Sequence, residues 1–356
     1  MKILQLIPNL GSGGAERFVV ELTNELKAQG ENCSIATLYD ITQYDKVSIS
    51  YVNNINLFSL GKKQGWDIRQ FWEVLQLIRK EKFDVVHAHI GAIKYILLAS
   101  IFLRNVRFVA TIHSEASREA GNKIEKYIRA FMFKFGFCKA VTISEESNIS
   151  FQKFYGFNTE MIYNGVSDYE QKENIVLRNN NKELVFIHAA SCHPVKNQEL
   201  LFKSFSILAQ EFDNVRLIWF GSNNTYKDLY KSLESYFSEK IRYGGLITNV
   251  RDYLVKADAF CLSSKMEGMP ISIIEAFSVG CIPLCTPVGG IKNMIQSGKN
   301  GMLSDDLSVE AYYKMLKNFV LIDANQRAQM IHCSKESFEK YKIATTAKKY
   351  IDLYKK

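Results

Sequence analysis

The chain has no long hydrophobic run and no closely paired cysteines, and both absences narrow the classes of protein to consider. No segment approaches the roughly 18 consecutive apolar residues of a membrane-spanning helix. The seven cysteines are scattered without a Cys-x-x-Cys pair, so neither a disulfide framework nor a zinc site is indicated. Met1 leads directly into an apolar segment, so we expect no secretory signal and a cytoplasmic protein.

Length and charge suggest a two-domain protein with anionic partners. The chain has 356 residues, of which 47% are hydrophobic, and this is enough for two domains with sizeable cores. The formal charge of +8 favours nucleotide phosphates or acidic lipid headgroups as partners. Because basic and acidic residues are interleaved and no nucleic-acid-binding module is present, we expect no nucleic-acid partner.

Short apolar runs alternate with helical periodicity along the whole chain, which is typical of parallel sheets covered by helices on both faces. The pattern is interrupted by a polar stretch at 168–183, interpreted as a linker, and then begins again. The sequence therefore predicts an α/β fold of two doubly wound, Rossmann-like domains, 1–167 and 184–339, facing each other across a cleft. Predicted strands are 2–8, 33–39, 84–90, 107–113, 139–144, 184–191, 215–221, 241–245, 259–264 and 282–287.

The most informative segment runs from Glu267 to Glu275. These two carboxylates flank the start of a predicted helix near Pro270, after a loop that contains Gly268 and Met269. A helix N-terminus attracts phosphate, since its first N–H groups lack partners and the helix dipole adds positive charge. The two carboxylates would then accept hydrogen bonds from hydroxyl groups of the same ligand. A ligand that carries both phosphate and a polyol is a sugar nucleotide.

Three further segments follow predicted strands, where ligands bind in such sheets. Gly13 and Gly14 open the first helix and would let the backbone approach a donor phosphate or sugar, or simply form a tight turn. Lys196 precedes a helix and would neutralise a diphosphate, unless it is a solvated loop lysine. Gly221 ends the predicted strand 215–221, but a single glycine at this position does not by itself indicate a ligand site. Glu16, where a dinucleotide fingerprint has Gly or Ala, argues against an NAD-dependent dehydrogenase.

Histidines end two predicted strands. His87 and His89 are two residues apart and therefore lie on one face of their strand. A metal pair is conceivable, but no third ligand follows at a suitable spacing, and a polar cleft wall or acceptor contact is favoured. His113 would either be buried and hydrogen-bonded or face the cleft and contact the transferred sugar.

Residues 122–137 predict an amphipathic helix. One stripe contains Ile124, Tyr127, Ile128, Phe131, Met132 and Phe135 and is assigned to the core. The opposite face, with Lys126, Arg129, Phe133 and Phe137, is either packed under a loop or suited to an anionic membrane surface.

Taken in order, these motifs resemble glycosyltransferase family 4, the retaining "glycosyl transferases group 1" with a GT-B fold. The likeness covers essentially the whole chain, and its specific part is the pair of glutamates with their flanks. It rests on Gly13–Arg17, Asp84–His89, His113, Asn164–Val166, Pro194–Asn197, Gly221, Glu267–Glu275 and Gly289–Gly290.

The resemblance implies roles for these residues. Glu267 and His113 would contact the donor sugar at the reacting face, and Glu275 would hold the ribose. Lys196 would bind the diphosphate, helped by amides near Gly13 and Gly14 and at the start of helix 271–279. No metal or other cofactor is implied, and the last helix, about 340–356, would pack back on the first domain. Ser191 departs from the family, which commonly has an arginine there; the candidate substitutes for that arginine are His193 and Lys265. Asn293 stands where a glutamate is common.

The leading hypothesis is a glycosyltransferase that moves a hexose from a UDP- or GDP-sugar to a glycan or lipid-linked acceptor in capsule, surface polysaccharide or lipopolysaccharide synthesis, at the inner face of the membrane. A non-catalytic nucleotide-sugar-binding subunit, suggested by Ser191, would bind nucleotide without turnover. A sugar-nucleotide epimerase would alter the donor and need no acceptor.

Overall fold

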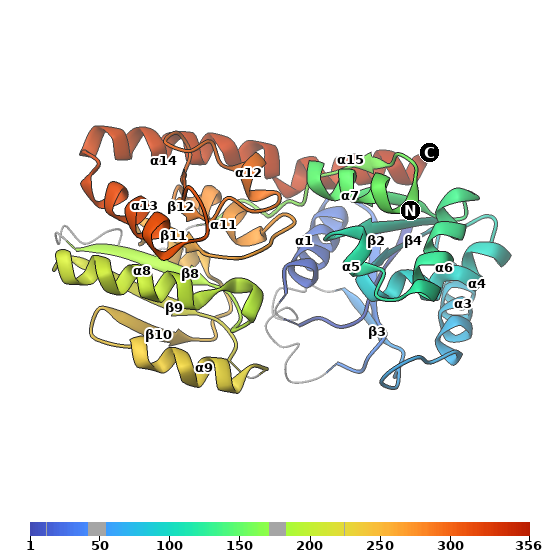
Figure 1. The fold of residues 1–356 in the computed structure, drawn as a ribbon. Coiled ribbons are helices and arrows are strands. Elements are labelled where there is room, and N and C mark those ends of the chain that lie inside the picture. Colours follow the sequence, from blue (N-terminus) through green and yellow to red (C-terminus); the bar gives the residue numbers. More distant parts are fainter. Residues whose placement is uncertain (12, 42–54, 171–182, 224) are drawn as a thin grey trace. The chain divides into compact units, whose positions relative to one another are not determined.

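The chain folds into two compact units, each built on one parallel sheet (Figure 1). Residues Met1–Ser167 and Tyr341–Lys356 form the first unit, and Asp168–Lys340 form the second. The computed structural model describes residues 1–11, 13–41, 55–170, 183–223 and 225–356. The greater part of the predicted linker, 171–182, lies outside the described residues.

The first unit has a seven-stranded sheet in the order β3-β2-β1-β4-β5-β6-β7, with every pairing parallel. Its central strands are buried almost throughout, as continuous apolar runs covered on both faces require. The strands are β1 (Lys2–Ile7), β2 (Asn32–Thr37), β3 (Asn56–Ser59), β4 (Val85–His89), β5 (Arg107–Ile112), β6 (Lys139–Thr142) and β7 (Glu160–Met161). The helices are α1 (Gly14–Ala28), α3 (Arg69–Glu81), η2 (Ile90–Ile96), α4 (Leu97–Phe102), α5 (Ala116–Glu119), α6 (Lys123–Lys134), α7 (Glu145–Tyr155) and, from the C-terminus, α15 (Ile343–Lys355).

Helix α15 is joined to the first unit by backbone contacts and packs against α1. The N–H of Ile343 donates to the carbonyl of Val166 at 2.9 Å, and the N–H of Val166 donates to Tyr341 at 3.1 Å. Gly165 allows this approach, because an added Cβ would lie 2.8 Å from the Cα of Ile343. The last helix therefore completes the first unit.

The second unit repeats the architecture with six parallel strands in the order β10-β9-β8-β11-β12-β13. The strands are β8 (Leu184–Ala189), β9 (Val215–Phe220), β10 (Ile241–Gly245), β11 (Ala259–Leu262), β12 (Ile282–Cys285) and β13 (Met302–Leu303). The helices are η3 (Pro194–Lys196), α8 (Gln198–Glu211), α9 (Lys227–Leu233), η4 (Glu234–Tyr236), α10 (Arg251–Leu254), α11 (Ile271–Val279), α12 (Ile291–Met294), α13 (Val309–Leu321) and α14 (Ala324–Phe338), with η5 (Glu339–Tyr341) leading back to the first unit.

The predicted fold class is confirmed: both sheets are doubly wound and all ten predicted strands are present. The sequence missed β3, β7 and β13, which are short and lie at or next to sheet edges. In each sheet the strand order reverses between two adjacent strands, β1 and β4 in the first unit and β8 and β11 in the second. Ligands of such folds bind outside the carboxyl ends of the strands at this switch point.

Candidate active site

Two loops meet at the switch point of the second unit and bring a lysine against a glutamate. One loop follows β8 and carries Lys196, and the other follows β11 and carries Glu267. Lys196 Nζ lies 2.7 Å from Glu267 Oε1, and the hydroxyl of Ser264 donates to the same oxygen at 2.6 Å. Their side chains are 30% and 11% exposed, so a cation and a carboxylate are both available at the carboxyl ends of the central strands.

The backbone of the two loops is fixed by direct hydrogen bonds. The hydroxyl of Ser263 donates to the carbonyl oxygens of Lys196 and Asn197, both at 3.0 Å. The N–H of Lys265 donates to the carbonyl of Val195 at 2.8 Å. Asn197 has a positive φ of 52°, a conformation that asparagine tolerates better than most residues. The serine pair after β11 therefore orders the turn that presents the lysine.

The Gly289-Gly290 pair supports Glu267 from behind. An added Cβ at Gly289 would lie 1.9 Å from the carbonyl oxygen of Glu267, and the φ of Gly289 is +47°. The N–H of Gly290 reaches the same carbonyl at 3.3 Å. Glycine is thus required there by both space and backbone conformation.

Helix α11 begins directly after the Glu267 loop, and its N-cap, Pro270, provides no side-chain hydrogen bond to the first turn. The side chains of Met269 and Pro270 are buried, so a ligand could reach this segment only through the backbone or Gly268. Glu275 lies one turn into α11 and is 9% exposed. The structure thus places the predicted loop, helix start and lysine in one region of the second unit.

The structure separates the two residues considered as substitutes for the missing arginine at Ser191. His193 Nδ1 accepts the N–H of Val195 at 3.1 Å, and its Nε2 lies 3.2 Å from the hydroxyl of Tyr226. Both ring nitrogens are therefore engaged. Lys265 is exposed, and no ion pair of its ammonium group is present within the described part of the chain. Lys265 remains the available cation.

The other glycines have packing roles. A Cβ at Gly221 would lie 2.0 Å from the carbonyl oxygen of Ala190, so this residue lets β9 end against the loop after β8. Gly13 is the N-cap of α1, and the carboxylate of Glu16 folds back over it, within 2.2 Å of where a Cβ would be. Gly14 is the first residue of α1. Contacts of Gly13, Gly14 and Gly221 with a donor stay predictions.

A buried histidine that the sequence did not single out lies near Lys196. His188, on β8, is fully buried; its Nδ1 donates to the carbonyl of Cys261 at 2.8 Å, while its Nε2 has no hydrogen-bond partner within the described part of the chain. Burial lowers the pKa of His188 to about 4. The only sequence signal was its position near the end of a central strand.

The predicted acceptor-side histidines lie inside the first unit, and that prediction is wrong. His87 and His89 share one strand face, as expected, but that face is covered and both side chains are fully buried. His87 Nδ1 lies 2.7 Å from the hydroxyl of Tyr354 on α15, and its Nε2 lies 2.7 Å from Thr111. His89 contacts Gln5 at 2.8 Å and His113 at 3.0 Å. The returning helix, which strand periodicity cannot reveal, closes this face.

His113 is half-buried at the end of this chain of contacts. With Gln5 Oε1 accepting from His89 Nε2, the neutral His89 ring accepts at Nδ1 from His113 Nε2. The remaining nitrogen, Nδ1 of His113, is then an acceptor; it is buried and has no partner among the described residues. Burial lowers the pKa of His113 to about 3, so the ring is neutral. A contact of His113 with the donor sugar stays a prediction.

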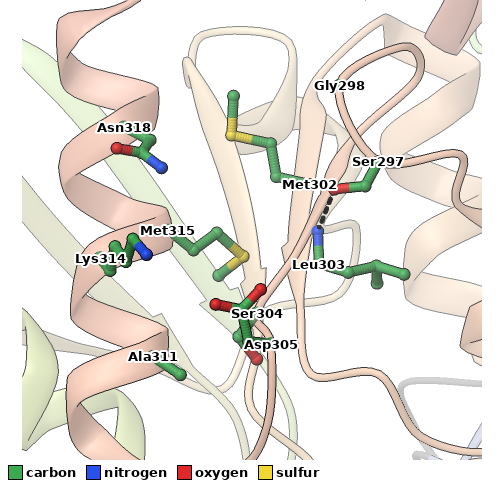
Figure 2. Close-up of a pocket in the computed structure, with 10 residues that line it drawn as sticks. All are labelled: Ser297, Gly298, Met302, Leu303, Ser304, Asp305, Ala311, Lys314, Met315 and Asn318. Atoms are coloured by element: carbon green, nitrogen blue, oxygen red, sulfur yellow. Dashed lines mark hydrogen bonds between the residues drawn. The ribbon is translucent and has the colours of Figure 1, made fainter.

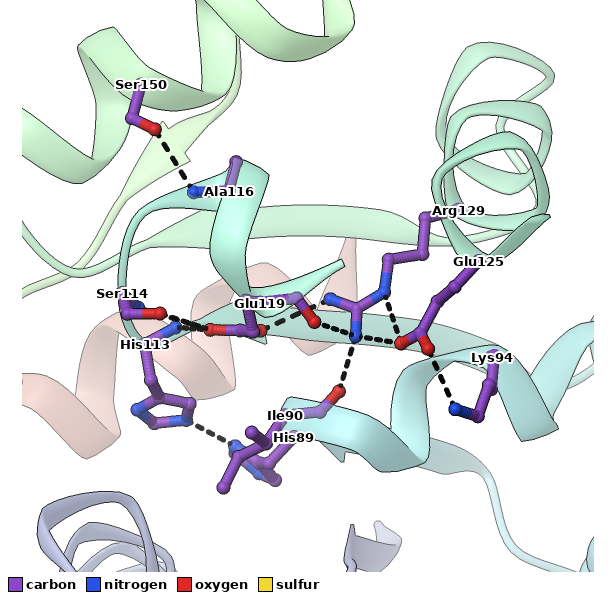
Figure 3. A network of polar contacts seen from close by, with 10 residues as sticks. All are labelled: His89, Ile90, Lys94, His113, Ser114, Ala116, Glu119, Glu125, Arg129 and Ser150. Atoms are coloured by element: carbon purple, nitrogen blue, oxygen red, sulfur yellow. Dashed lines mark hydrogen bonds and ion pairs between the residues drawn. The ribbon is translucent and has the colours of Figure 1, made fainter. Parts of the chain in front are cut away.

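The predicted faces of α6 are largely reversed: four residues of the predicted core stripe, Ile124, Tyr127, Phe131 and Phe135, are exposed, whereas Met132 is buried as predicted. Arg129 is fully buried and Phe133 is 8% exposed, so neither can belong to a membrane face. Figure 3 shows the guanidinium of Arg129 between Glu119 and Glu125, a pairing that offsets the desolvation cost of burying its charge. Lys126 and Phe137 are half-buried.

A pocket of about 350 Å³ lies between β13 and α13 of the second unit (Figure 2). Its lining combines Met302 and Met315 with Asp305 and Lys314. None of the predicted site residues contributes to it, so it gives no support to a second catalytic region.

The described residues contain neither a group of side chains that could bind a metal ion nor a helix that could span a membrane. No group of three or more His, Cys, Asp or Glu side chains there could hold a metal ion. No helix within the same residues is long and apolar enough to cross a membrane.

Comparison with known proteins agrees with this architecture. The family described as Glycosyltransferase Family 4 matches residues 12–169, and Glycosyl transferases group 1 matches residues 170–337. The capsular polysaccharide biosynthesis glycosyltransferase CapH of Staphylococcus aureus is 25% identical, over 90% of this chain and 91% of the relative. A Campylobacter jejuni alpha-1,4-N-acetyl-D-galactosaminyltransferase, whose name includes diNAcBac-PP-undecaprenol, is 24% identical over 99% of this chain and 98% of its own.

The crystal structure of HepE from Anabaena in complex with UDP matches 99% of both chains, with a TM-score of 0.80 and 17% identity. The fold and the relatives together define a glycosyltransferase with the GT-B architecture. More specifically, the chain belongs to glycosyltransferase family 4.

Proposed function

We propose that this enzyme binds a UDP- or GDP-linked sugar in its second unit and transfers the sugar, with retention of configuration, to a glycan or lipid-linked acceptor. The observation that carries the proposal is the grouping of Lys196, Glu267 and the uncapped start of α11 at the switch point of that unit. The name of CapH supports a role in capsular polysaccharide biosynthesis, and the name of the Campylobacter jejuni relative supports a lipid-linked acceptor.

Lys196 takes the diphosphate and Glu267 takes a sugar hydroxyl. In the structure these two groups neutralise each other at 2.7 Å. An arriving diphosphate competes with Glu267 for the ammonium group, and the freed carboxylate accepts hydrogen bonds from the sugar. The amides of the first turn of α11 add positive potential, and Glu275 holds the ribose hydroxyls.

The reaction needs stabilisation of the leaving group more than a base from the protein. As the bond between the sugar and the diphosphate breaks, negative charge grows on the phosphate oxygens beside Lys196. The leaving phosphate takes the proton of the acceptor hydroxyl, which attacks from the same face. Lys196, with Lys265 as a second cation, supplies the positive charge, so the proposed mechanism uses no metal.

Turnover of a donor panel tests the proposal. Purified protein is incubated with UDP- and GDP-sugars, and free nucleotide is measured with and without a membrane lipid extract. Release from one donor, accelerated by the extract, is the expected result. Conversion of a donor into its epimer without acceptor would favour the epimerase instead. Nucleotide binding, seen by thermal shift, without any release would favour a non-catalytic subunit.

A further inference from the structure

Helix α6 exposes a continuous apolar stripe to solvent. Ile124, Tyr127, Phe131 and Phe135 are spaced by three, four and four residues, so they lie on one side of the helix and its C-cap. Their exposed fractions are 63%, 69%, 41% and 64%. Phe131 stacks on Phe137 and contacts Phe135, with ring centroids 5.4 Å and 5.1 Å away. We call these four residues the α6 stripe.

The polar side of α6 is turned inward because its charges are neutralised there. Arg129 pairs with Glu119 and Glu125 and donates to the carbonyl oxygens of Ile90, at 2.9 Å, and Glu119, at 3.0 Å. Glu125 also accepts from Lys94 at 2.7 Å. Figure 3 shows these groups converging between α6, α5 and η2. This network fixes the orientation of the helix and leaves the stripe outside.

Three exposed cations, Lys123, Lys134 and Arg104, lie on or beside α6. Lys123 and Lys134, at the two ends of α6, are exposed, whereas the acid of this helix, Glu125, is buried. Arg104, just after α4, lies with its guanidinium 5.0 Å from the ring centre of Phe137. Within the described residues, none of these three cations has a carboxylate partner. The surface is therefore apolar at its centre and cationic at its edges.

The same surface extends onto α4, which packs against α6 (Figure 1). Phe102, at the end of α4, is 62% exposed. A helix that lies in a membrane interface inserts its apolar side chains between headgroups while flanking lysines and arginines bind anionic lipid. The arrangement has both parts.

We propose that the α6 stripe and the cations Lys123, Lys134 and Arg104 form a docking surface for a bilayer that contains anionic lipid. Exposure and charge complementarity alone support this surface, independently of the proposed reaction. A partner of this kind needs no groove, because lipid adapts to a convex helix surface. The surface would bring the first unit to the membrane without any spanning segment.

Co-sedimentation of the full-length protein with vesicles tests the proposal. Wild type is expected to bind vesicles of phosphatidylcholine and phosphatidylglycerol, and to bind them less as salt increases. Tyr127→Ser/Phe131→Ser should reduce binding by about tenfold or more, because two inserted side chains are lost. Leu321→Ser, equally exposed on α13 of the second unit, is the control and should bind as wild type does.

Charge reversal separates the electrostatic part. Lys123→Glu/Lys134→Glu should abolish the preference for anionic over neutral vesicles, whereas Lys256→Glu/Lys299→Glu, with the same change in net charge at exposed positions of the second unit, should retain it. Unchanged thermal melting confirms that the variants fold. Failure of wild type to bind anionic vesicles, or equal binding by all variants, overturns the proposal. A wild-type dimer in sedimentation velocity that becomes monomeric in Tyr127→Ser/Phe131→Ser would assign the stripe to self-association instead.

Discussion

Lys196 Nζ lies 2.7 Å from Glu267 Oε1, although 71 positions separate the two residues in the sequence. The pair joins the loop after β8 to the loop after β11, the two loops at the switch point of the second unit. Lys196 and Glu267, the cation and the carboxylate of the proposed mechanism, therefore hold each other in place. Replacing either side chain would change the electrostatic environment of the other.

Glu267→Ala should separate catalysis from nucleotide binding. Loss of the carboxylate lowers turnover by about a hundredfold or more if it acts on charge developing in the transition state. Affinity for UDP or GDP should stay equal or increase, because Lys196 no longer pairs with a carboxylate. Isothermal titration calorimetry and steady-state kinetics measure the two effects.

Glu275→Ala should show the opposite pattern, with weaker nucleotide binding. Equal nucleotide affinity in wild type and Glu275→Ala would remove the ribose assignment.

Lys265→Met tests the second cation. Both nitrogens of His193 are engaged, so Lys265 is the group that can take the place of an arginine at 191. Affinity for the diphosphate nucleotide should fall by about tenfold, which corresponds to about 1.4 kcal/mol. Lys256→Met, an exposed lysine elsewhere in this unit, is the matched control. Identical nucleotide affinity in both variants would show that Lys265 does not contact the phosphates.

Gly289→Ala should impair activity through the position of Glu267. The added Cβ would lie 1.9 Å from the carbonyl oxygen of Glu267, so the loop must move. Gly298→Ala is a close control, since Gly298 also has a positive φ, +83°, but open space around its Cα. Both variants carry backbone strain, and only Gly289→Ala should lose turnover strongly. A similar loss in both would mean that strain alone is responsible.

Phe133 and Phe131 lie two residues apart on α6 and should respond differently to substitution. Phe133→Ala removes a ring packed on Phe151 and Tyr155 and should lower the free energy of unfolding by about 3–5 kcal/mol. Phe131→Ala removes a largely exposed ring and should change it by about 0.5 kcal/mol. Urea denaturation measures both values. A larger loss in Phe131→Ala would contradict the orientation of α6.

Stability should fall in mild acid because several histidines are buried in the neutral form. Burial lowers the pKa of His113 to about 3 and that of His188 to about 4, and it lowers the pKa values of His87 and His89 as well. Below about pH 6.5 the unfolded chain binds protons that the folded chain excludes, so each such histidine reduces stability by about 1.4 kcal/mol per pH unit.

This loss begins near pH 6.5, grows as pH falls toward about 4, and is absent above neutrality. Denaturation midpoints measured from pH 8 to pH 5 test the prediction. His332→Gln, at an exposed position, should leave the profile unchanged. A flat profile over this range would mean that these rings take up protons in the folded protein as readily as in the unfolded chain.

The sequence by itself determined the two sheets and the order of the motifs. Apolar runs such as 215–221 and the helical period of 197–211 are local signals. Because ligand-binding groups lie in the loops after strands, Lys196 and Glu267 could also be selected from the local sequence. The packing of Gly289 and Gly290 against the backbone of Glu267 could not be predicted from the sequence, because it depends on a contact between two loops.

Only the tertiary structure decided which polar side chains are buried. Local pattern placed Arg129 outside, but Glu119, from a separate segment, provides a second carboxylate that helps to offset the cost of burying the guanidinium. His87 was placed at a cleft, but Tyr354, from the returning C-terminal helix, covers it. Burial of a polar side chain depends on partners that are distant in sequence, whereas the period of an apolar pattern does not; this is why the sheets were predictable and the two polar faces were not.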